Sequence, residues 1–300
     1  MRPALLVIGH GTKSESGCAE FAELVDRVQL RAPYVDVAGG FLELAPPPIQ
    51  DAVARLVAAG HGTIDVVPLV LVAAGHSKGD IPAALEREKL RHPGLVFRYG
   101  RPLGPHPDLL AAAEARLAAV VPREQWGDTA VVLVGRGATD PDANSEVAKT
   151  ARLLQEGRGI GAVETAFVSL AEPSVPQGLD RAERLGYSRV VVLPWFLFSG
   201  VLPDRIAAQT GAWAEVHPAV EVHAAGLLGP GDELAGVVLE RWVEIDGGDL
   251  RMNCDTCAYR VALPGFEDKV GAAQTPHDHP DDPAHPHGHA DGHGHGHPHP

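Results

Sequence analysis

The sequence ALLVIGHGT at residues 4–12 is the strongest indication of the fold. It is a short apolar run followed by a glycine-flanked histidine, which is typical of a buried parallel strand that ends in a tight loop. A shift of 126 residues, from position 4 to position 130, superposes it on AVVLVGRGA, residues 130–138. Because self-similarity at a fixed spacing marks a duplicated structural unit, we predict two diverged copies of one unit.

The same shift aligns further positions in the two halves. With one residue of slippage near the end, the matched sets are Phe41, Leu44, Ala45 and Pro47 with Phe167, Leu170, Ala171 and Pro173, then Gly60, Pro68 and Leu71 with Gly186, Pro194 and Leu197, and finally residues 103–105 with residues 228–230. An ordered series of this length favours a duplication over a single chance match.

Each half alternates apolar β-branched runs with amphipathic stretches, which predicts βαβ units around a parallel sheet. In the first half we expect strands at residues 4–8, 35–42, 63–72 and 96–99 and helices at residues 19–31, 48–59, 81–91 and 108–120. The second half repeats this order. The predicted fold class is therefore α/β, with two similar lobes, each a parallel sheet flanked by helices. The expected divisions are residues 1–122 for one lobe, residues 123–246 for the other, a turn-rich linker at residues 122–128, and an extension at residues 247–300.

The 300 residues carry a formal net charge of −14. This balance argues against nucleic acid as the main partner, because phosphate binding draws on clustered Lys and Arg. It also means that an anionic substrate needs a local positive site. Three cysteines are too few for the disulfide framework of a secreted protein, and neither a signal sequence nor an apolar run of membrane-spanning length is evident. We therefore expect a cytoplasmic protein with no membrane partner.

Three polar side chains follow the first three expected strands, namely His10, Glu43 and His76. The loops after parallel strands meet at one edge of the sheet, where open α/β folds bind their ligands. Two imidazoles and a carboxylate form a competent site for a divalent ion such as Co, Ni, Fe or Zn. We therefore predict that these residues surround one metal ion, in a cleft between the lobes.

The second copy lacks this set of ligands. The positions that match His10, Glu43 and His76 hold Arg136, Ser169 and, within a two-residue slip, Leu202. We thus expect the first lobe alone to bind the ion. The remaining histidines of the two halves are interpreted as surface or hydrogen-bonded residues: His61, His92, His106, His217 and His223.

Three motifs of the first half carry a family resemblance. They are LLVIGHGT at residues 5–12, FLELAPP at residues 41–47, and PLVL at residues 68–71 followed by GHSKGDIP at residues 75–82. With the duplication, they resemble the long, two-lobed sirohydrochlorin cobaltochelatases of the class II chelatases over most of residues 1–246. The resemblance implies a lyase that inserts a divalent metal, with Co²⁺ preferred, into the tetrapyrrole sirohydrochlorin in the cobalamin pathway. It places the metal-handling role on His10 and His76.

Metal insertion removes solvent ligands from the ion and two pyrrole protons from the macrocycle. Neutral imidazole, with a reference pKa of about 6.5, holds an ion weakly or accepts a proton near neutral pH. We expect His10 and His76 to present the metal and Glu43 to take up protons or complete the coordination. Donors for the substrate carboxylates are expected among the loop amides and in Ser77, Lys78 and Arg136. The alternative for Arg136 is a solvated loop residue.

The repeat ends near residue 247. Beyond it, Cys254 and Cys257 form a Cys-x-x-Cys pair, which suits a metal, a cluster or a redox couple. In the resembling family such an element is associated with an iron–sulfur cluster, but two thiolates require a second subunit, as in a homodimer, or other ligands. The alternative is a reduced pair without a cofactor. Residues 277–299 hold nine histidines, and we expect a disordered tail that binds divalent metals as a reservoir.

Other functions stay open. Iron insertion for siroheme, or nickel insertion, uses similar ligands, and these ligands do not rank the metals. A metal-delivery protein would use the tail and the Cys pair, with the lobes as a scaffold, but the presence of His10 and His76 argues against it. A phosphate-transferring hydrolase with His10 as nucleophile is weakened because Arg-His-Gly is absent there.

Overall fold

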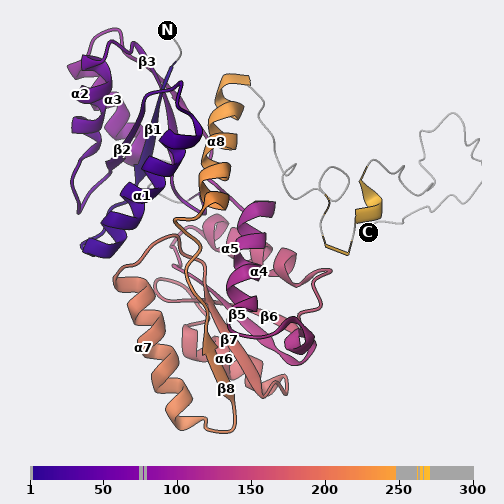
Figure 1. Cartoon of the computed structure of the whole chain (residues 1–300). Helices are drawn as coiled ribbons and strands as arrows, with labels where there is room; N and C mark the ends of the chain where they lie inside the picture. Colours follow the sequence, from indigo (N-terminus) through magenta and orange to yellow (C-terminus); the bar gives the residue numbers. More distant parts are fainter. Residues whose placement is uncertain are drawn as a thin grey trace, which may run out of the picture.

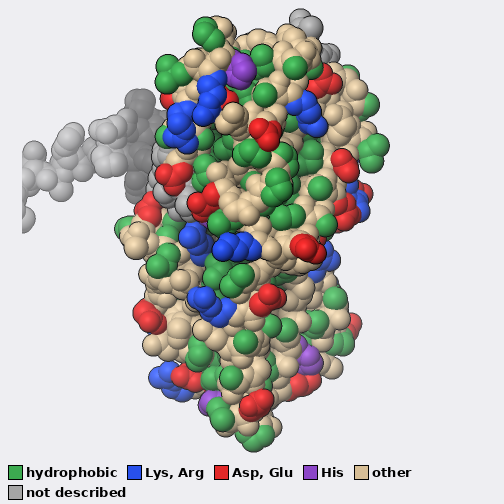
Figure 2. Space-filling view, turned by 90° about the vertical axis from the view of Figure 1, so that its left-hand side faces the viewer, with side chains coloured by type: hydrophobic (Ala, Val, Ile, Leu, Met, Phe, Trp, Pro, Cys, Tyr) green, Lys and Arg blue, Asp and Glu red, His purple; other side chains and the backbone are tan. Residues whose placement is uncertain are grey.

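A computed structural model describes residues 3–73, 77, 80–247, 262, 264–265 and 267–270. It contains two α/β lobes, which lie one above the other in Figure 1 and in the space-filling side view of Figure 2. Each lobe has a four-stranded parallel sheet, with the order β2-β1-β3-β4 in the first and β6-β5-β7-β8 in the second. The predicted fold class is confirmed, and the identical strand order of the two sheets supports the duplication.

The elements alternate along the chain as a βα series. The first half forms β1 (Ala4–Gly9), α1 (Glu15–Arg31), β2 (Val37–Phe41), α2 (Ile49–Ala58), β3 (Thr63–Pro68), α3 (Ile81–Arg91), β4 (Val96–Tyr99) and α4 (Pro107–Ala118). The second half forms β5 (Ala130–Gly135), α5 (Pro141–Gln155), β6 (Ala162–Phe167), α6 (Val175–Arg184), β7 (Arg189–Pro194), α7 (Val201–Val216), β8 (Glu221–Ala224) and α8 (Asp232–Gly247). Short 3₁₀ helices are η2 (Arg123–Asp128) and η4 (Glu267–Lys269). Within the described part of the chain, no helix has the length and apolar character that crossing a bilayer requires.

Two element boundaries differ from expectation for local reasons. The third strand ends at Pro68 and not at residue 72, and its counterpart β7 ends at Pro194. Proline has no N–H with which to continue a strand ladder. Helix α1 begins at Glu15 and not at residue 19, because Ser14 caps it and accepts a hydrogen bond from the Gly17 amide at 3.3 Å.

The stretch at residues 122–128 is more than a polar linker. It folds into η2, and its Trp126 side chain is only 1% exposed. The indole Nε1 donates a hydrogen bond to the Val121 carbonyl at 3.0 Å. A buried indole with its N–H satisfied anchors the connection, so the interpretation of this segment as turn-rich and polar was incomplete.

Helices α4 and α8 cross between the lobes. Helix α8 packs against α1 and β3 of the first lobe, while α4 packs against α5 and β7 of the second, and the two helices pack against each other (Figure 1). One hydrophobic cluster consequently runs through both lobes, from Leu5 and Leu109 to Val131 and Val237. Each repeat therefore gives its last helix to the other lobe, and the lobes share one core.

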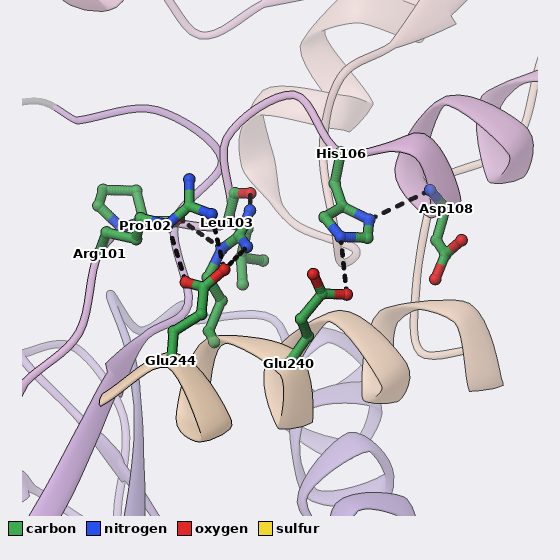
Figure 3. Close-up of polar contacts among 8 residues, drawn as sticks. Arg101, Pro102, Leu103, His106, Asp108, Glu240 and Glu244 are labelled. Atoms are coloured by element: carbon green, nitrogen blue, oxygen red, sulfur yellow. Dashed lines mark hydrogen bonds and ion pairs between the residues drawn. The ribbon is translucent and has the colours of Figure 1, made fainter. Parts of the chain in front are cut away.

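A buried arginine fixes this exchange. The Arg241 side chain on α8 is fully buried and donates to the carbonyls of Pro102 at 3.1 Å and Leu103 at 2.6 Å. It also pairs with Glu244 at 3.0 Å, and Glu244 accepts two further hydrogen bonds from Arg101. Figure 3 shows the segment before α4 facing the glutamates of α8. The guanidinium thereby ties the strand-to-helix segment of one repeat to the last helix of the other.

A second contact lies one helical turn away. The His106 imidazole Nε2 lies 3.1 Å from Glu240 of α8, while its Nδ1 accepts a hydrogen bond from the Asp108 amide at 3.2 Å (Figure 3). His106 thus caps the N-terminus of α4 and bonds to α8 at the same time.

Replacing Arg241 by Ala should lower the free energy of unfolding by about 3 kcal/mol or more, because it leaves the buried Leu103 carbonyl and the partly buried Pro102 carbonyl without their donor and removes one of the hydrogen bonds to Glu244. Urea denaturation of the full chain measures this loss. Arg152→Ala, which removes an exposed ion pair with Glu156, serves as the control and should cost less than about 1 kcal/mol. Equal losses in the two variants would contradict the role given to Arg241.

Candidate functional site

A cavity of ≈ 450 Å³ lies where strand ends of the two lobes face each other. Its walls are the loops after β1, β2 and β3 on one side and the loops after β5 and β7 on the other, with the first turns of α1, α5 and α7. Much of the lining is apolar, and the aromatic members are Phe21, Phe41, Trp195, Phe196 and Phe198. The cavity has the size of a small-molecule site and occupies the edge of the sheet where such sites form.

The structure brings Glu43 next to His10, and of the two residues His10 lines the cavity. The His10 Nε2 atom lies 3.2 Å from Glu43 Oε1, and the two side chains are 32% and 53% exposed, respectively. The His10 Nδ1 atom lies 3.2 Å from the Gly11 carbonyl. Because a carbonyl only accepts, Nδ1 carries the proton of this contact. In a neutral ring, Nε2 is then unprotonated and faces a carboxylate. A proton or a metal ion between the two atoms would bind to both of them.

The backbone around Glu43 is strained and held. Leu44 has a left-handed φ of 67°, a conformation that is uncommon for residues other than glycine. The Glu43 amide donates to the His10 carbonyl at 3.0 Å, and the Ala45 amide donates to the Glu43 carbonyl at 2.8 Å. These hydrogen bonds fix the loop after β2 against the loop after β1, so that the imidazole and the carboxylate share one volume.

The second lobe has the same loop geometry with other side chains. Leu170, which matches Leu44, has a φ of 59°, and the Ser169 amide donates to the Arg136 carbonyl at 3.0 Å. The two lobes thus present His10 and Glu43 on one side and Arg136 and Ser169 on the other from equivalent backbones. At these two pairs of loops, the chemical difference between the lobes lies in the side chains.

His76 and Lys78 lie outside the described residues, but Ser77 between them is described. Ser77 is 5% exposed and lines the cavity. The Tyr99 hydroxyl donates to the Ser77 carbonyl at 3.0 Å, and burial raises the pKa of Tyr99, so the phenol keeps its proton at all ordinary pH values. That His76 belongs to this site stays a prediction from the sequence.

Arg136 lines the cavity from the second lobe and is exposed. Its guanidinium makes no hydrogen bond or ion pair with the residues that the structure describes. The loop that carries it is nevertheless fixed, because the Asn144 side chain accepts from the Ala138 amide at 2.9 Å and donates to the Ala138 carbonyl at 2.8 Å. Lys13, which the sequence arguments passed over, also lines the cavity.

A direct contact joins the lobes beside the cavity. The Glu20 carboxylate on α1 accepts hydrogen bonds from the Ser199 amide at 2.6 Å and from the Ser199 hydroxyl at 2.7 Å. Gly17, one turn earlier, leaves room for this approach, because a Cβ there would lie 2.2 Å from the Ser199 carbonyl oxygen. The sequence gives no local signal for this pair, since its members come from different repeats.

The remaining sequence predictions divide into two groups. His61, His106, His217 and His223 each make a side-chain hydrogen bond, as interpreted from the sequence. Cys254, Cys257 and the histidines of residues 277–299 lie outside the described residues, so the cluster, the homodimer and the reservoir stay predictions. Cys18 is a free cysteine, and its thiol lies 3.5 Å from the Thr12 carbonyl.

Substitution of Gly11 by Ala should disrupt the site. Gly11 has a φ of 106°, and a Cβ there would lie 1.7 Å from the Glu43 carbonyl oxygen, so the Glu43 loop must move away from His10. We expect Co²⁺ affinity in the cleft to fall at least about tenfold, or about 1.4 kcal/mol, as measured by calorimetric titration. Gly62→Ala, where nothing lies within 4 Å, is the control. Unchanged affinity in the Gly11 variant would contradict this account of the site.

Comparison with known proteins bears on this cleft. The sequence model of the CbiX family matches residues 4–120 and again residues 130–245. The chain is 36% identical to the sirohydrochlorin cobaltochelatase of Priestia megaterium, over 87% of this chain and 85% of that protein. It is 31% identical to the sirohydrochlorin ferrochelatase of the same species, over 69% of this chain and 77% of that one.

Solved structures give the same result. SirB from Bacillus subtilis with Fe³⁺ superposes with a TM-score of 0.73 at 29% identity, covering 83% of this chain and 98% of that one. The sirohydrochlorin chelatase SirB from Bacillus subtilis subspecies spizizenii in complex with cobalt gives 0.69 at 27% identity, covering 83% and 97%. The family resemblance seen in the three motifs is therefore confirmed, and the chain belongs to the CbiX family.

Proposed function

We propose that this protein is a sirohydrochlorin cobaltochelatase, which inserts Co²⁺ into sirohydrochlorin with release of two protons. One observation carries the choice of cobalt. The alignment with the cobaltochelatase covers 87% of the 300 residues, which is more than the lobes up to residue 247 supply, so it includes part of the extension. The ferrochelatase alignment, at 69%, is shorter than the two lobes.

The His10–Glu43 pair supports a role in metal presentation. An Nδ1–H fixed on the Gly11 carbonyl leaves the Nε2 lone pair facing Glu43, and proteins orient metal-binding imidazoles by such a contact at the other ring nitrogen. The carboxylate at 3.2 Å adds a negative ligand, and it also accepts a proton. We propose that these groups, with His76, hold Co²⁺ as it loses water and then take up the protons that leave the pyrrole nitrogens.

The opposite wall suits the substrate. Trp195 and Phe198 offer an apolar surface for the flat macrocycle, while Arg136 offers a charged donor for one of its carboxylates. Three helices begin at the cleft, and the first turn of α7 follows Gly200, which provides no side-chain cap. Exposed amides at helix N-termini attract anions. These local donors offset the acidic net charge of the chain, as an anionic substrate requires.

Iron insertion is the second candidate. It is favoured by the 31% identity to a ferrochelatase, and the two SirB structures hold Fe³⁺ and cobalt in the same fold. The donor set of the cleft accepts either ion. A metal-delivery role, by contrast, does not account for the His10–Glu43 pair or for the apolar wall of the cleft.

Initial rates with sirohydrochlorin and Co²⁺, Fe²⁺ or Ni²⁺, followed anaerobically by the change in the visible spectrum, test the proposal. We expect the highest kcat/KM with Co²⁺. His10→Ala should lower the rate with every metal by at least about 100-fold, with an unchanged circular dichroism spectrum. A higher value with Fe²⁺ would overturn the choice of cobalt, and no turnover with any metal would overturn the chelatase assignment.

Arg136→Ala separates substrate binding from metal handling. Loss of one charge-assisted hydrogen bond should raise the KM for sirohydrochlorin about tenfold, which corresponds to about 1.4 kcal/mol. The dependence of the rate on Co²⁺ should stay as in the unmodified chain. Arg152→Ala, an exposed arginine outside the cleft, is the matched control for the lost charge. An unchanged KM in Arg136→Ala would mean that this side chain is only a solvated loop residue.

A further inference from the structure

We propose that the second lobe contains a separate site for a divalent transition-metal ion, formed by Asp180, Glu183 and His217. A ligand atom from each of these side chains lies within 4.8 Å of the other two, and all three residues are partly buried. Asp180 and Glu183 are one helical turn apart on α6, so they share a face of that helix. His217 is the residue that ends α7, which packs against α6.

Trp213 orients two of the three side chains. The His217 Nδ1 atom lies 2.8 Å from the Trp213 carbonyl, and the imidazole stacks on the indole at 3.8 Å with an interplanar angle of 6°. Because the carbonyl only accepts, Nδ1 is the donor, and the neutral ring has its lone pair on Nε2. That atom lies 3.6 Å from Glu183 Oε2. The Trp213 indole also donates to Asp180 Oδ1 at 2.7 Å. Fixed outer contacts of this kind are what metal-binding side chains use.

The negative charge of Asp180 and Glu183 also favours the binding of a cation. Two carboxylates lie close together beside an imidazole, and among the described residues no Lys or Arg forms an ion pair with Asp180 or Glu183. One nitrogen and two carboxylate oxygens suit Zn²⁺, Co²⁺ or Ni²⁺, with water completing the shell, better than Mg²⁺ or Ca²⁺, which take oxygen ligands.

The first lobe serves as an internal comparison. At the shift of 126 residues, Asp180 and Glu183 match Ala54 and Val57 of α2. His92, the residue that ends α3, occupies the same place in its lobe as His217. The fold of the repeat therefore forms without either carboxylate, and only the second copy combines both with the histidine.

This site is distinct from the cleft. The first turn of α7 lines the cleft, whereas His217 follows the last turn. A helix of 16 residues spans about 24 Å, so one ion cannot serve both places. Figure 1 shows α7 running from the side of its lobe that faces the other lobe to the far end of its own lobe. The inference does not rest on the proposed chelatase activity.

Zn²⁺ binding to the full chain tests the site. We compare the unmodified chain with Asp180→Asn and Glu183→Gln, which keep the shape of each side chain, and with His217→Ala. Asp180→Asn also keeps an acceptor for the Trp213 indole. Equilibrium dialysis should give one Zn²⁺ fewer per chain in each variant. The rise in Tm on adding Zn²⁺ should also be smaller, because an ion that binds only the folded chain stabilises it by mass action.

His223→Ala is the matched control, since His223 bonds to Glu221 at 2.8 Å but belongs to no cluster of three ligands among the described residues. Its Zn²⁺ count and Tm rise should equal those of the unmodified chain. Chelatase rates should be unchanged in Asp180→Asn, so failure of the chelatase assignment and failure of this site are separate results. Equal Zn²⁺ counts in all four variants would overturn the site and leave Asp180, Glu183 and His217 as a metal-free contact between α6 and α7.

Discussion

The exchange of α4 and α8 between the lobes is the constraint on which the cleft depends. Arg241, fully buried on α8, donates to the segment that leads into α4, and the two helices pack against each other. A charge buried in this way is stable only while its partners stay in place. The lobes are therefore joined by a shared core, and the strand ends of the two sheets face each other across a fixed gap.

Within that frame, one backbone supports two kinds of chemistry. The loop after β1 makes the same backbone hydrogen bonds to the loop after β2 as the loop after β5 makes to the loop after β6. Leu44 and Leu170 have left-handed φ values at equivalent positions of these loops. On the first lobe they present His10 and Glu43, and on the second they present Arg136. A duplication followed by a few side-chain changes thus places an imidazole beside a carboxylate on one lobe and a guanidinium on the other. The copies also differ in side chains far from the cleft, where α6 carries Asp180 and Glu183 at the positions of Ala54 and Val57 in α2.

The site was partly predictable because its residues obey a local rule. Parallel strands end at one edge of their sheet, so His10 and Glu43 were expected together from sequence, and they lie 3.2 Å apart. Glu20 and Ser199 follow no such rule, and neither do Glu183 and His217. The two members of each pair belong to different elements, which meet only because of how the helices pack. The periodicity of the sequence does not predict that packing.

Strand patterns and glycine-rich turns are local properties, so the duplication, the α/β class and the difference between the two copies could be predicted from the sequence. Three features are visible only in the three-dimensional structure: α4 and α8 pack on the opposite lobe, Trp126 is buried within a polar segment, and His217 lies beside two carboxylates of α6. The reason is physical. Helix propensity and amphipathic pattern specify that a helix has a buried face, but they leave open which of two similar sheets covers that face. In a duplicated chain both sheets offer nearly the same surface to a helix. Buried contacts such as those of Arg241 therefore determine which sheet the helix packs against.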